Sequence, residues 1–257
     1  MKQLDFGKTA PDYVRYRVGF PDELFARLVA KGIGQKGQRV LDLGTGTGTL
    51  ARGFAQRGCE VVGLDVAEGL VAEARRLDEK SGIRIDYVVA PAERTGLPPS
   101  AFDAVVVGQA WQWFERPKAI KEVLRLIKPG GAFVIAHFDP LPMPGNVVEL
   151  AHRMVESYNP EHRRGPSSGL HPDWLDDVRR ARFESIETFS FDVDVAFAHE
   201  AWRGRVRTSS GVAPSLAPDT VARFDERLRL ALVEHFPEEP LSVPHCAWAL
   251  TCRRPSR

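Results

Sequence analysis

The sequence predicts an α/β fold in which a mostly parallel sheet is covered by helices on both faces. Short, β-branched apolar runs of strand length recur through the first half of the chain, and each is separated from the next by enough residues for a helix or a crossover. Two of the separating segments repeat apolar residues at the spacing of an amphipathic helix. Because strands that alternate with helices form parallel sheets with both faces covered, this pattern indicates the fold class.

The predicted strands of the first half share an apolar, β-branched composition. They comprise residues 39–43, 60–65, 84–89, 103–108 and 132–138. Helices are predicted over residues 67–77 and 118–127, where the apolar side chains fall on one helical face. Each of these helices can therefore cover the sheet with that face.

The pattern changes near the end of the chain. Residues 189–195 alternate between apolar and polar side chains, which is typical of a strand with one buried face, and residues 243–252 form a second late strand. Between them, residues 219–236 carry apolar side chains at helical spacing. That segment is predicted to be a covering helix.

Two stretches do not belong to the alternation of strands and helices. They are residues 1–20 and residues 139–172, the second of which is rich in Pro, Gly, His and Arg and contains a short predicted helix over residues 146–158. Long insertions into compact α/β domains are usually functional or disordered. We expect both stretches to be cap elements over the ends of the strands.

Length and composition limit the function classes. The 257 residues exceed the roughly 100–200 of an average domain but fit one α/β domain with insertions, so a single domain over residues 1–257 is predicted. With 43% hydrophobic and 27% charged residues, the chain is typical of a globular protein. A net charge of +1 argues against a nucleic-acid partner. Since no apolar run suits a membrane span or a signal peptide, we expect a cytoplasmic protein without a membrane partner.

Cysteine and histidine spacing gives no indication of a metal site. The three cysteines, Cys59, Cys246 and Cys252, fit neither a disulfide framework nor a zinc site. The histidines outside the strand ends lack the mutual spacing of metal ligands; they are His152, His162, His171, His199 and His245. No metal is therefore predicted.

The most informative motif is a glycine-rich turn that follows the first predicted strand. The apolar run that ends at Leu43 leads into Gly44-Thr45-Gly46-Thr47-Gly48, and glycines there let the backbone approach a bound nucleotide. The next predicted strand ends in Asp65, whose carboxylate can accept hydrogen bonds from the two ribose hydroxyls of an adenosine. Strand, turn, helix, strand and acid in this order predict a nucleotide-type pocket.

The spacing of this turn is G-x-G-x-G, whereas dinucleotide-binding folds have G-x-G-x-x-G. Further motifs follow in order over residues 40–138: Ala92-Glu93, Leu97-Pro98 before Phe102-Asp103, Gln109-Ala110-Trp111-Gln112-Trp113-Phe114, and Leu126-Ile127-Lys128-Pro129-Gly130-Gly131. With these motifs the sequence resembles the class I S-adenosylmethionine-dependent methyltransferases. The resemblance implies a Rossmann-like, seven-stranded sheet that is mostly parallel, with an antiparallel C-terminal strand.

The resemblance also implies which residues bind the cofactor. Gly44, Thr45 and Gly46 would contact its methionine portion, and Asp65 its ribose. Asp42 would order the loop or meet the amino-acid end through water, and a carboxylate that only caps the backbone of the turn is the alternative.

The same resemblance places the rest of the cofactor against the ends of later strands. Val66 would flank the adenine, and Ala92 and Glu93 would lie at its edge. Gln109 and Ala110 would line the floor near the sulfonium.

Within the family, the run from Gln109 to Phe114 and the N-terminal pattern that begins at Tyr13 most resemble the small-molecule branch that includes trans-aconitate methyltransferase-like proteins. In that branch the N-terminal segment folds over the cofactor, so Tyr13 and Arg17 are expected to close the site. The resemblance does not identify the acceptor, because relatives diverge in the cap regions that select it.

The expected reaction requires little covalent catalysis by the protein. A sulfonium is already an activated electrophile, so the enzyme mainly aligns the acceptor and excludes water. A base is needed only if the acceptor carries a proton at neutral pH, and His137, at the end of the fifth strand, is the candidate. A structural histidine bonded to a cap carbonyl is the alternative.

Two further groups of side chains are candidates for acceptor binding. Trp111 and Trp113 follow the fourth strand and either line the acceptor pocket or belong to the core. Arg203 and Arg205 lie in a segment with arginines at alternate positions. They form either a clamp for a carboxylate or phosphate, or a solvated polar face.

The sequence thus predicts an S-adenosylmethionine-dependent methyltransferase that methylates an oxygen or nitrogen of a small molecule and releases S-adenosylhomocysteine. A nucleotide-cofactor (NAD-type) oxidoreductase and a non-catalytic S-adenosylmethionine-binding module are the alternatives. An RNA methyltransferase is disfavoured by the balanced charge, and because Gly108-Gln109-Ala110-Trp111 replaces the acidic-aromatic tetrapeptide of base-amino methyltransferases. A monomer and a homodimer are both compatible with the sequence.

Overall fold

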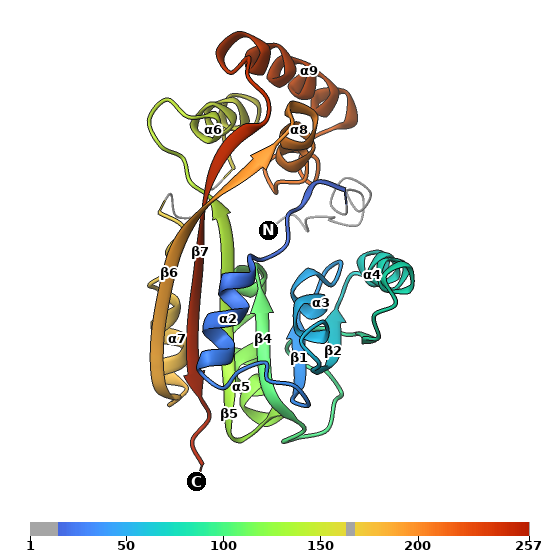
Figure 1. Ribbon diagram of the computed structural model, residues 1–257, viewed down its shortest axis with the longest axis vertical. Helices are drawn as coiled ribbons and strands as arrows, with labels where there is room; N and C mark the ends of the chain where they lie inside the picture. The colour runs from blue at the N-terminus through green and yellow to red at the C-terminus, as the bar shows by residue number, and fades with distance from the viewer. Residues whose placement is uncertain (1–14, 163–167, 257) are drawn as a thin grey trace. The chain divides into compact units, whose positions relative to one another are not determined.

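A computed structural model describes residues 15–162 and 168–256 (Figure 1). The chain divides into two compact units, each assembled from three stretches. Unit 1 takes the described residues up to Val18, Asp139–Leu170 and Asp192–Cys246, and unit 2 takes Gly19–Phe138, His171–Phe191 and the described residues from Ala247 onward. The single domain and the two cap elements stay predictions.

One seven-stranded sheet organises the fold, in the order β3-β2-β1-β4-β5-β7-β6. Its strands are β1 (Arg39–Leu43), β2 (Glu60–Asp65), β3 (Asp86–Val89), β4 (Phe102–Gly108), β5 (Ile127–Pro140), β6 (Glu184–Phe197) and β7 (Leu241–Arg253). The first five strands pair in parallel, whereas β7 runs in the opposite direction to its neighbours (Figure 1). The predicted mostly parallel sheet with an antiparallel C-terminal strand is therefore confirmed.

The strand order determines where a ligand can bind. β1 pairs with β2 on one side and with β4 on the other, so that Val40 lies opposite Val61 and Ala104. The order of the sheet reverses at this point, and in open α/β sheets ligands bind beyond the carboxyl ends of the strands at such a switch point. The glycine turn follows β1 at this point, and Asp65 is the last residue of the neighbouring strand β2.

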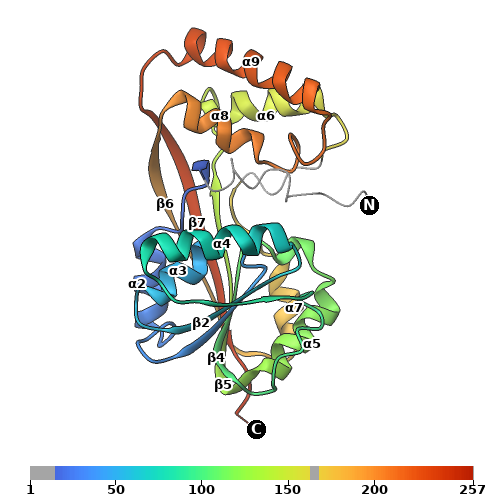
Figure 2. The ribbon, with the colours of Figure 1, turned by 90° about the vertical axis from the view of Figure 1, so that its right-hand side faces the viewer.

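Helices cover both faces of the sheet in unit 2. They are α2 (Asp22–Ala30), α3 (Thr49–Ala55), α4 (Glu68–Ser81), the short 3₁₀ helix η2 (Trp111–Trp113), α5 (Arg116–Leu126) and α7 (Trp174–Arg180). In Figure 2, α2 and α3 lie on one side of the strands, and α5 and α7 on the other. The predicted helix over residues 67–77 continues to Ser81, where Gly82 in a left-handed conformation ends it.

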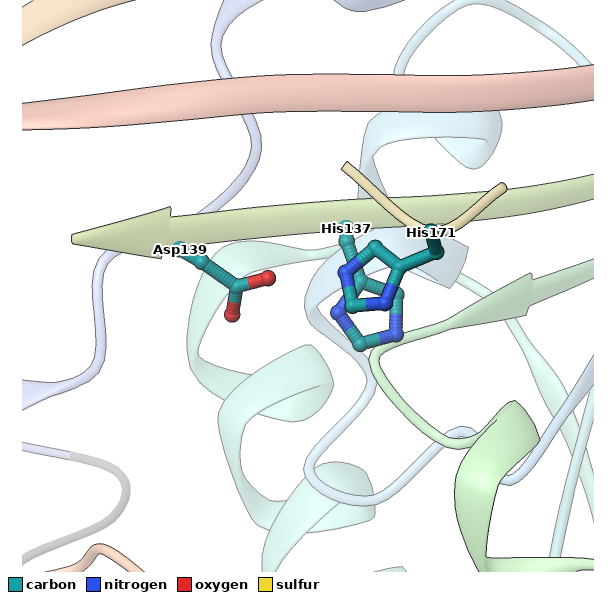
Figure 3. A group of neighbouring side chains, drawn as sticks. All are labelled: His137, Asp139 and His171. Atoms are coloured by element: carbon teal, nitrogen blue, oxygen red, sulfur yellow. The ribbon is translucent and has the colours of Figure 1, made fainter. Parts of the chain in front are cut away.

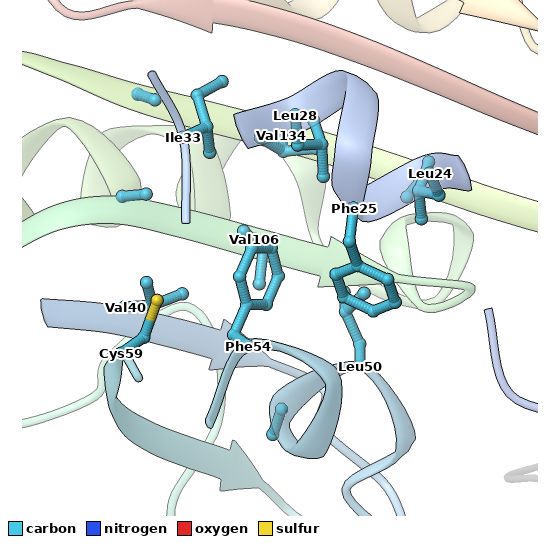
Figure 4. Close-up of a cluster of buried hydrophobic side chains, with 14 of the residues drawn as sticks. Leu24, Phe25, Leu28, Ile33, Val40, Leu50, Phe54, Cys59, Val106 and Val134 are labelled. Carbon is cyan, nitrogen blue, oxygen red and sulfur yellow. The ribbon is translucent and has the colours of Figure 1, made fainter. Parts of the chain in front are cut away.

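The core of unit 2 packs α2 and α3 against the sheet (Figure 4). Phe25 of α2 meets Phe54 of α3 edge to face, with ring centroids 5.3 Å apart. A Cβ atom on Gly53 would lie 2.1 Å from the ring of Phe25, so a glycine is required where the two helices approach each other. Fully burying one such side chain contributes roughly 1.5–3 kcal/mol.

Unit 1 has a core of its own, formed by α6 (Val147–Tyr158), α8 (His199–Arg207) and α9 (Pro218–His235). The side chain of Asn146 accepts a hydrogen bond from the backbone of Glu149 and caps α6, which agrees with the helix predicted over residues 146–158. Trp202, Phe224 and Leu228 are buried at the centre of this core. Within the described parts of both units, no helix is long and apolar enough to cross a membrane.

Candidate active site

The glycine turn after β1 is closed on one side and open on another. Gly44 has a φ of +70°, and a Cβ atom there would lie 2.6 Å from the Cβ of Ala110. Only glycine therefore allows the turn to approach the segment after β4 this closely. At Gly46, with a φ of +55°, no described atom outside Gly46 and its two chain neighbours lies within 4 Å of the corresponding position. The backbone at Gly46 is thus accessible to a ligand.

Asp65, at the end of β2, is attached to this turn. One oxygen of its carboxylate accepts a hydrogen bond from the backbone of Gly46 at 2.8 Å, and the other accepts one from the backbone of Ala67 at 2.9 Å. Burial raises the pKa of Asp65, and these two N–H donors act in the opposite direction. Each carboxylate oxygen keeps a second lone pair, so the side chain can also accept from hydroxyl groups.

Asp42, near the end of β1, is fully buried beneath the turn. Its Oδ2 accepts a hydrogen bond from the hydroxyl of Thr45 at 2.7 Å, whereas its Oδ1 has no hydrogen-bond partner among the described residues. Burial raises the pKa of Asp42 to about 7, and the hydroxyl of Thr45 and the backbone N–H of Ala51 only partly offset that effect. Buried acceptors in folded proteins are usually paired, so Oδ1 has the capacity to accept a further hydrogen bond.

The predicted adenine side lies at the ends of β2 and β3. Val66 is 71% exposed directly after Asp65, and Ala92 is buried. The carboxylate of Glu93 accepts a hydrogen bond from the backbone of Glu115 at 2.8 Å. The segment after β3 is thereby fixed to the start of α5.

The segment after β4 begins with a residue in a strained backbone conformation. Gln109 has a φ of +55°, which is uncommon for a residue with a side chain, and its amide donates to the carbonyl of Phe138 at 2.6 Å. Ala110 is buried against Gly44. These contacts place the two residues beside the glycine turn.

The two tryptophans of this segment differ in exposure. Trp111 is fully buried, packs edge to face on Phe133 with centroids 5.4 Å apart, and donates from Nε1 to Asp177 of α7 at 3.0 Å. Arg116 donates to the same carboxylate oxygen at 3.0 Å. This geometry favours the core alternative for Trp111, whereas Trp113 is 51% exposed.

The predicted arginines belong to unit 1, where they make internal contacts. Arg203 and Arg207 both form ion pairs with Asp225 of α9. Arg205, between them in sequence, is buried. Arg17 donates to the hydroxyl of Thr208 at 3.3 Å. Tyr13 lies outside the described residues.

His137, near the end of β5, is buried among other rings of unit 2. It lies beside the ring of His171 (Figure 3), with ring centroids 4.1 Å apart. The ring centroid of Trp174 lies 4.9 Å from that of His137. The general-base role stays a prediction. Sequence spacing gave no signal for the neighbourhood of His137 and His171, or for the contact of Asp177 with Trp111, because both arise from distant segments.

Comparisons with known proteins agree with this arrangement. The family described as "Methyltransferase domain" matches residues 41–135. A demethylmenaquinone methyltransferase of Clavibacter sepedonicus is 37% identical over 181 residues, which make up 63% of this chain and 72% of that relative. The chain belongs to the methyltransferase-domain family. It spans about half the length of several other curated relatives that it matches.

Solved structures of methyltransferases share the fold. A protein from Anaeromyxobacter dehalogenans, proposed to be a type II methyltransferase, superposes with a TM-score of 0.65 at 24% identity and covers 93% of this chain and 99% of its own. Phosphoethanolamine N-methyltransferase 2 of Haemonchus contortus, solved with phosphomonomethylethanolamine and S-adenosylhomocysteine, gives a TM-score of 0.59 at 18% identity and covers 99% of this chain and 59% of its own. The Rossmann-like fold of the class I methyltransferases is thus confirmed.

Proposed function

We propose that the protein is an S-adenosylmethionine-dependent methyltransferase that methylates an oxygen or nitrogen of a small molecule and releases S-adenosylhomocysteine. One observation carries the proposal: two carboxylates, Asp42 and Asp65, are both hydrogen-bonded to a glycine turn whose backbone is open at Gly46. A ligand with a cationic amino-acid end and a ribose matches the two acids. The methyltransferase-domain family of the chain supports the same cofactor.

Each acid has a separate part in holding that cofactor. Asp65 accepts hydrogen bonds from the two ribose hydroxyls through its remaining lone pairs. Asp42 accepts from the ammonium group of the methionine portion, directly or through water, at the oxygen that has no donor among the described residues. Gly44 and Thr45 line the same end.

The remaining cofactor contacts come from the later strand ends. Val66 covers one face of the adenine, with Ala92 and Glu93 at its edge. Gln109 and Ala110 form the floor beneath the reacting centre. The bound cofactor supplies a methyl group on an activated sulfonium, so this chain has only to position the acceptor and exclude water.

On the acceptor side, the proposal assigns roles to two residues. The exposed ring of Trp113 lines the acceptor pocket, and His137 takes a proton where the acceptor carries one at neutral pH. Tyr13 and Arg17 close the site. The buried ring of Trp111 and the ion pair of Arg203 with Asp225 make these side chains weaker candidates for acceptor contacts.

The acceptor is proposed to be a small molecule, without nucleic acid or membrane as partner, because the net charge of +1 offers no basic excess. We further propose a cytoplasmic location, on the composition of a globular protein, and a monomer or homodimer.

Calorimetric titration of the full chain with S-adenosylhomocysteine, beside NAD, tests the cofactor. Binding of S-adenosylhomocysteine near one per chain, with no binding of NAD, is the expected result. Binding of NAD alone would overturn the proposal in favour of an oxidoreductase. With the cofactor established, methyl transfer is followed on small carboxylates, phenols and amines, and tight binding without any turnover would indicate a non-catalytic module.

A further inference from the structure

A hydrogen-bonded network of unit 2 borders the glycine turn and is not part of the proposed cofactor contacts. Arg52 of α3 donates from Nη1 to Oδ1 of Asp78 at 2.8 Å, and the hydroxyl of Tyr87 donates to Oδ2 of the same carboxylate at 2.8 Å. Arg52 also donates from Nη2 to the backbone carbonyl of Thr47 at 2.6 Å. The network therefore connects α4, which carries Asp78, and β3, which carries Tyr87, to the backbone of the turn.

The ion pair at the centre of this network is largely shielded from solvent. The side chain of Asp78 is 5% exposed, and that of Arg52 is 16% exposed. Thr47 is buried as well. A buried carbonyl requires a donor, and a buried ion pair is favourable only where further hydrogen bonds satisfy both charges. Arg52 meets both requirements, because one guanidinium nitrogen donates to the acid and another donates to the carbonyl.

Two glycines let Tyr87 approach the turn. A Cβ atom on Gly63, inside β2, would lie 2.5 Å from the ring of Tyr87. A Cβ atom on Gly48, the last glycine of the turn, would lie 2.4 Å from the hydroxyl of Tyr87 and 3.0 Å from Nη1 of Arg52. Gly48 has a φ of +78°, so both the backbone conformation and the space favour glycine there. A glycine inside an apolar strand marks such a close approach, and here it places the polar ends of the network against the turn.

The network holds the part of the turn that β2 does not hold. The carbonyl of Leu64 in β2 accepts hydrogen bonds from the backbone N–H groups of residues 44–45, at 2.7 and 3.0 Å. These bonds anchor the first part of the turn, whereas Arg52 anchors the last part through Thr47. Gly46, whose backbone is open, lies between the two anchored parts. The conformation of the open backbone therefore depends on both sets of contacts.

We propose that Arg52, Asp78 and Tyr87 are positioning residues of the proposed cofactor site. They hold the last part of the glycine turn in the conformation that receives S-adenosylmethionine, and they act on the cofactor through the turn. A ligand binds more tightly to a site whose conformation is already fixed, because binding then does not have to order the turn. The inference rests on the proposed function, since it concerns the affinity of that same site.

Calorimetric titration of the full chain with S-adenosylhomocysteine tests the positioning role. Arg52→Met keeps the apolar part of the side chain but removes the donors to Thr47 and Asp78, and it is expected to raise the Kd at least ~10-fold. Arg52→Lys keeps a positive charge and N–H donors, so it is expected to bind at least ~3-fold more tightly than Arg52→Met. Tyr87→Phe keeps the ring over Gly63 and removes only the hydroxyl, and its Kd is expected to rise at least ~3-fold.

Asp103→Asn is the matched control. Like Asp78, Asp103 accepts hydrogen bonds from a cationic side chain and from a neutral donor, namely Lys128 at 2.6 Å and the backbone of Arg39 at 2.8 Å. Arg39 begins β1, so this carboxylate lies at the opposite end of the strand from the turn. Asp103→Asn is therefore expected to bind S-adenosylhomocysteine like the wild type, even where it lowers the free energy of unfolding. Circular dichroism and thermal unfolding establish that each variant is folded.

The outcomes separate the positioning role from the proposed function. Absence of S-adenosylhomocysteine binding by the wild type would overturn both. Where the wild type binds, three results would each overturn the positioning role alone: wild-type affinity in folded Arg52→Met, no recovery in Arg52→Lys, or an equal loss of affinity in Asp103→Asn. If Arg52→Met does not fold, Tyr87→Phe decides, since an unchanged affinity of that variant would also overturn the role.

Discussion

Replacing Asp42 by Asn should remove a pH-dependent loss of stability. The carboxyl group has an ordinary pKa of 3.8, and burial raises its pKa to about 7 in the folded protein. The unfolded chain therefore ionises Asp42 at a lower pH than the folded chain does. Its contribution to the free energy of unfolding is fully present below about pH 3.8 and is lost as the pH rises to about 7. Asn is neutral throughout, and its carbonyl oxygen can still accept from Thr45.

The magnitude follows from the difference between the two pKa values of Asp42. Each pH unit between them changes the free energy of unfolding by about 1.4 kcal/mol, so the whole range of about three units corresponds to about 4 kcal/mol. Between about pH 5 and about pH 7, the stability of Asp42→Asn relative to the wild type should increase by about 3 kcal/mol. Above that range the difference should stay constant, because Asp42 is then ionised in both states.

Denaturant unfolding of the cofactor-free protein, repeated across this pH range, measures the difference. Other titrating groups are common to both proteins and cancel when the two free energies of unfolding are subtracted. Asp176→Asn serves as the control for the loss of one carboxylate, since Asp176 has a side chain 62% exposed on α7. Parallel curves for wild type and Asp42→Asn would refute the reasoning, because they would mean that burial does not hold the proton on Asp42.

Substitutions at three further positions test the turn and the segment after β4. Asp65→Ala should weaken binding of S-adenosylhomocysteine by about 1–3 kcal/mol in calorimetry, because it removes a charged acceptor for the ribose; equal affinity in the folded variant would contradict that role. Gly44→Ala should destabilise the fold by at least about 1 kcal/mol in thermal unfolding, since its Cβ would lie 2.6 Å from that of Ala110 at a positive φ; an unchanged midpoint would show that the turn can shift. Asp177→Ala leaves Nε1 of buried Trp111 without its acceptor and should cost about 1–3 kcal/mol in denaturant unfolding, whereas Asp177→Asn should recover part of the loss by accepting that bond. Equal stabilities of the two Asp177 variants would show that the hydrogen bond contributes little.

The central strands were predictable because their residues alone determine them. β1 and β2 begin and end where the sequence indicates, since each is an apolar run that stops at a turn or an acid. β5 begins at Ile127 rather than at residue 132. Its Pro and Gly residues indicate a loop, but the backbone of Gly130 donates to Arg254 and that of Arg254 donates to Gly131. This pairing depends on the distant end of the chain, so no local pattern reports it.

The segment with alternating arginines shows that partners depend on distant elements. Arg203 and Arg205, at alternate positions in the sequence, are predicted to form a clamp for an anion or a solvated face, and these roles stay predictions. The segment forms helix α8, in which Arg203 and Arg207 are four residues apart and share the face that meets Asp225. Arg205 points elsewhere on the helix and is buried. The decisive acid, Asp225, lies on α9, which the sequence does not connect with this segment.

The turn after β1 could be predicted as a binding site because one short motif holds several of the features that such a site requires. The sequence supplied the glycines and the two acids, but not that both acids are hydrogen-bonded to the turn. Asp42 binds it through the hydroxyl of Thr45, and Asp65 through the backbone of Gly46. The same carboxylates thus set the conformation of the turn and offer lone pairs to a ligand. A loss of affinity after substitution of either acid therefore contains a contribution from the turn itself, and a comparison of binding with unfolding free energy in the same variant separates the two.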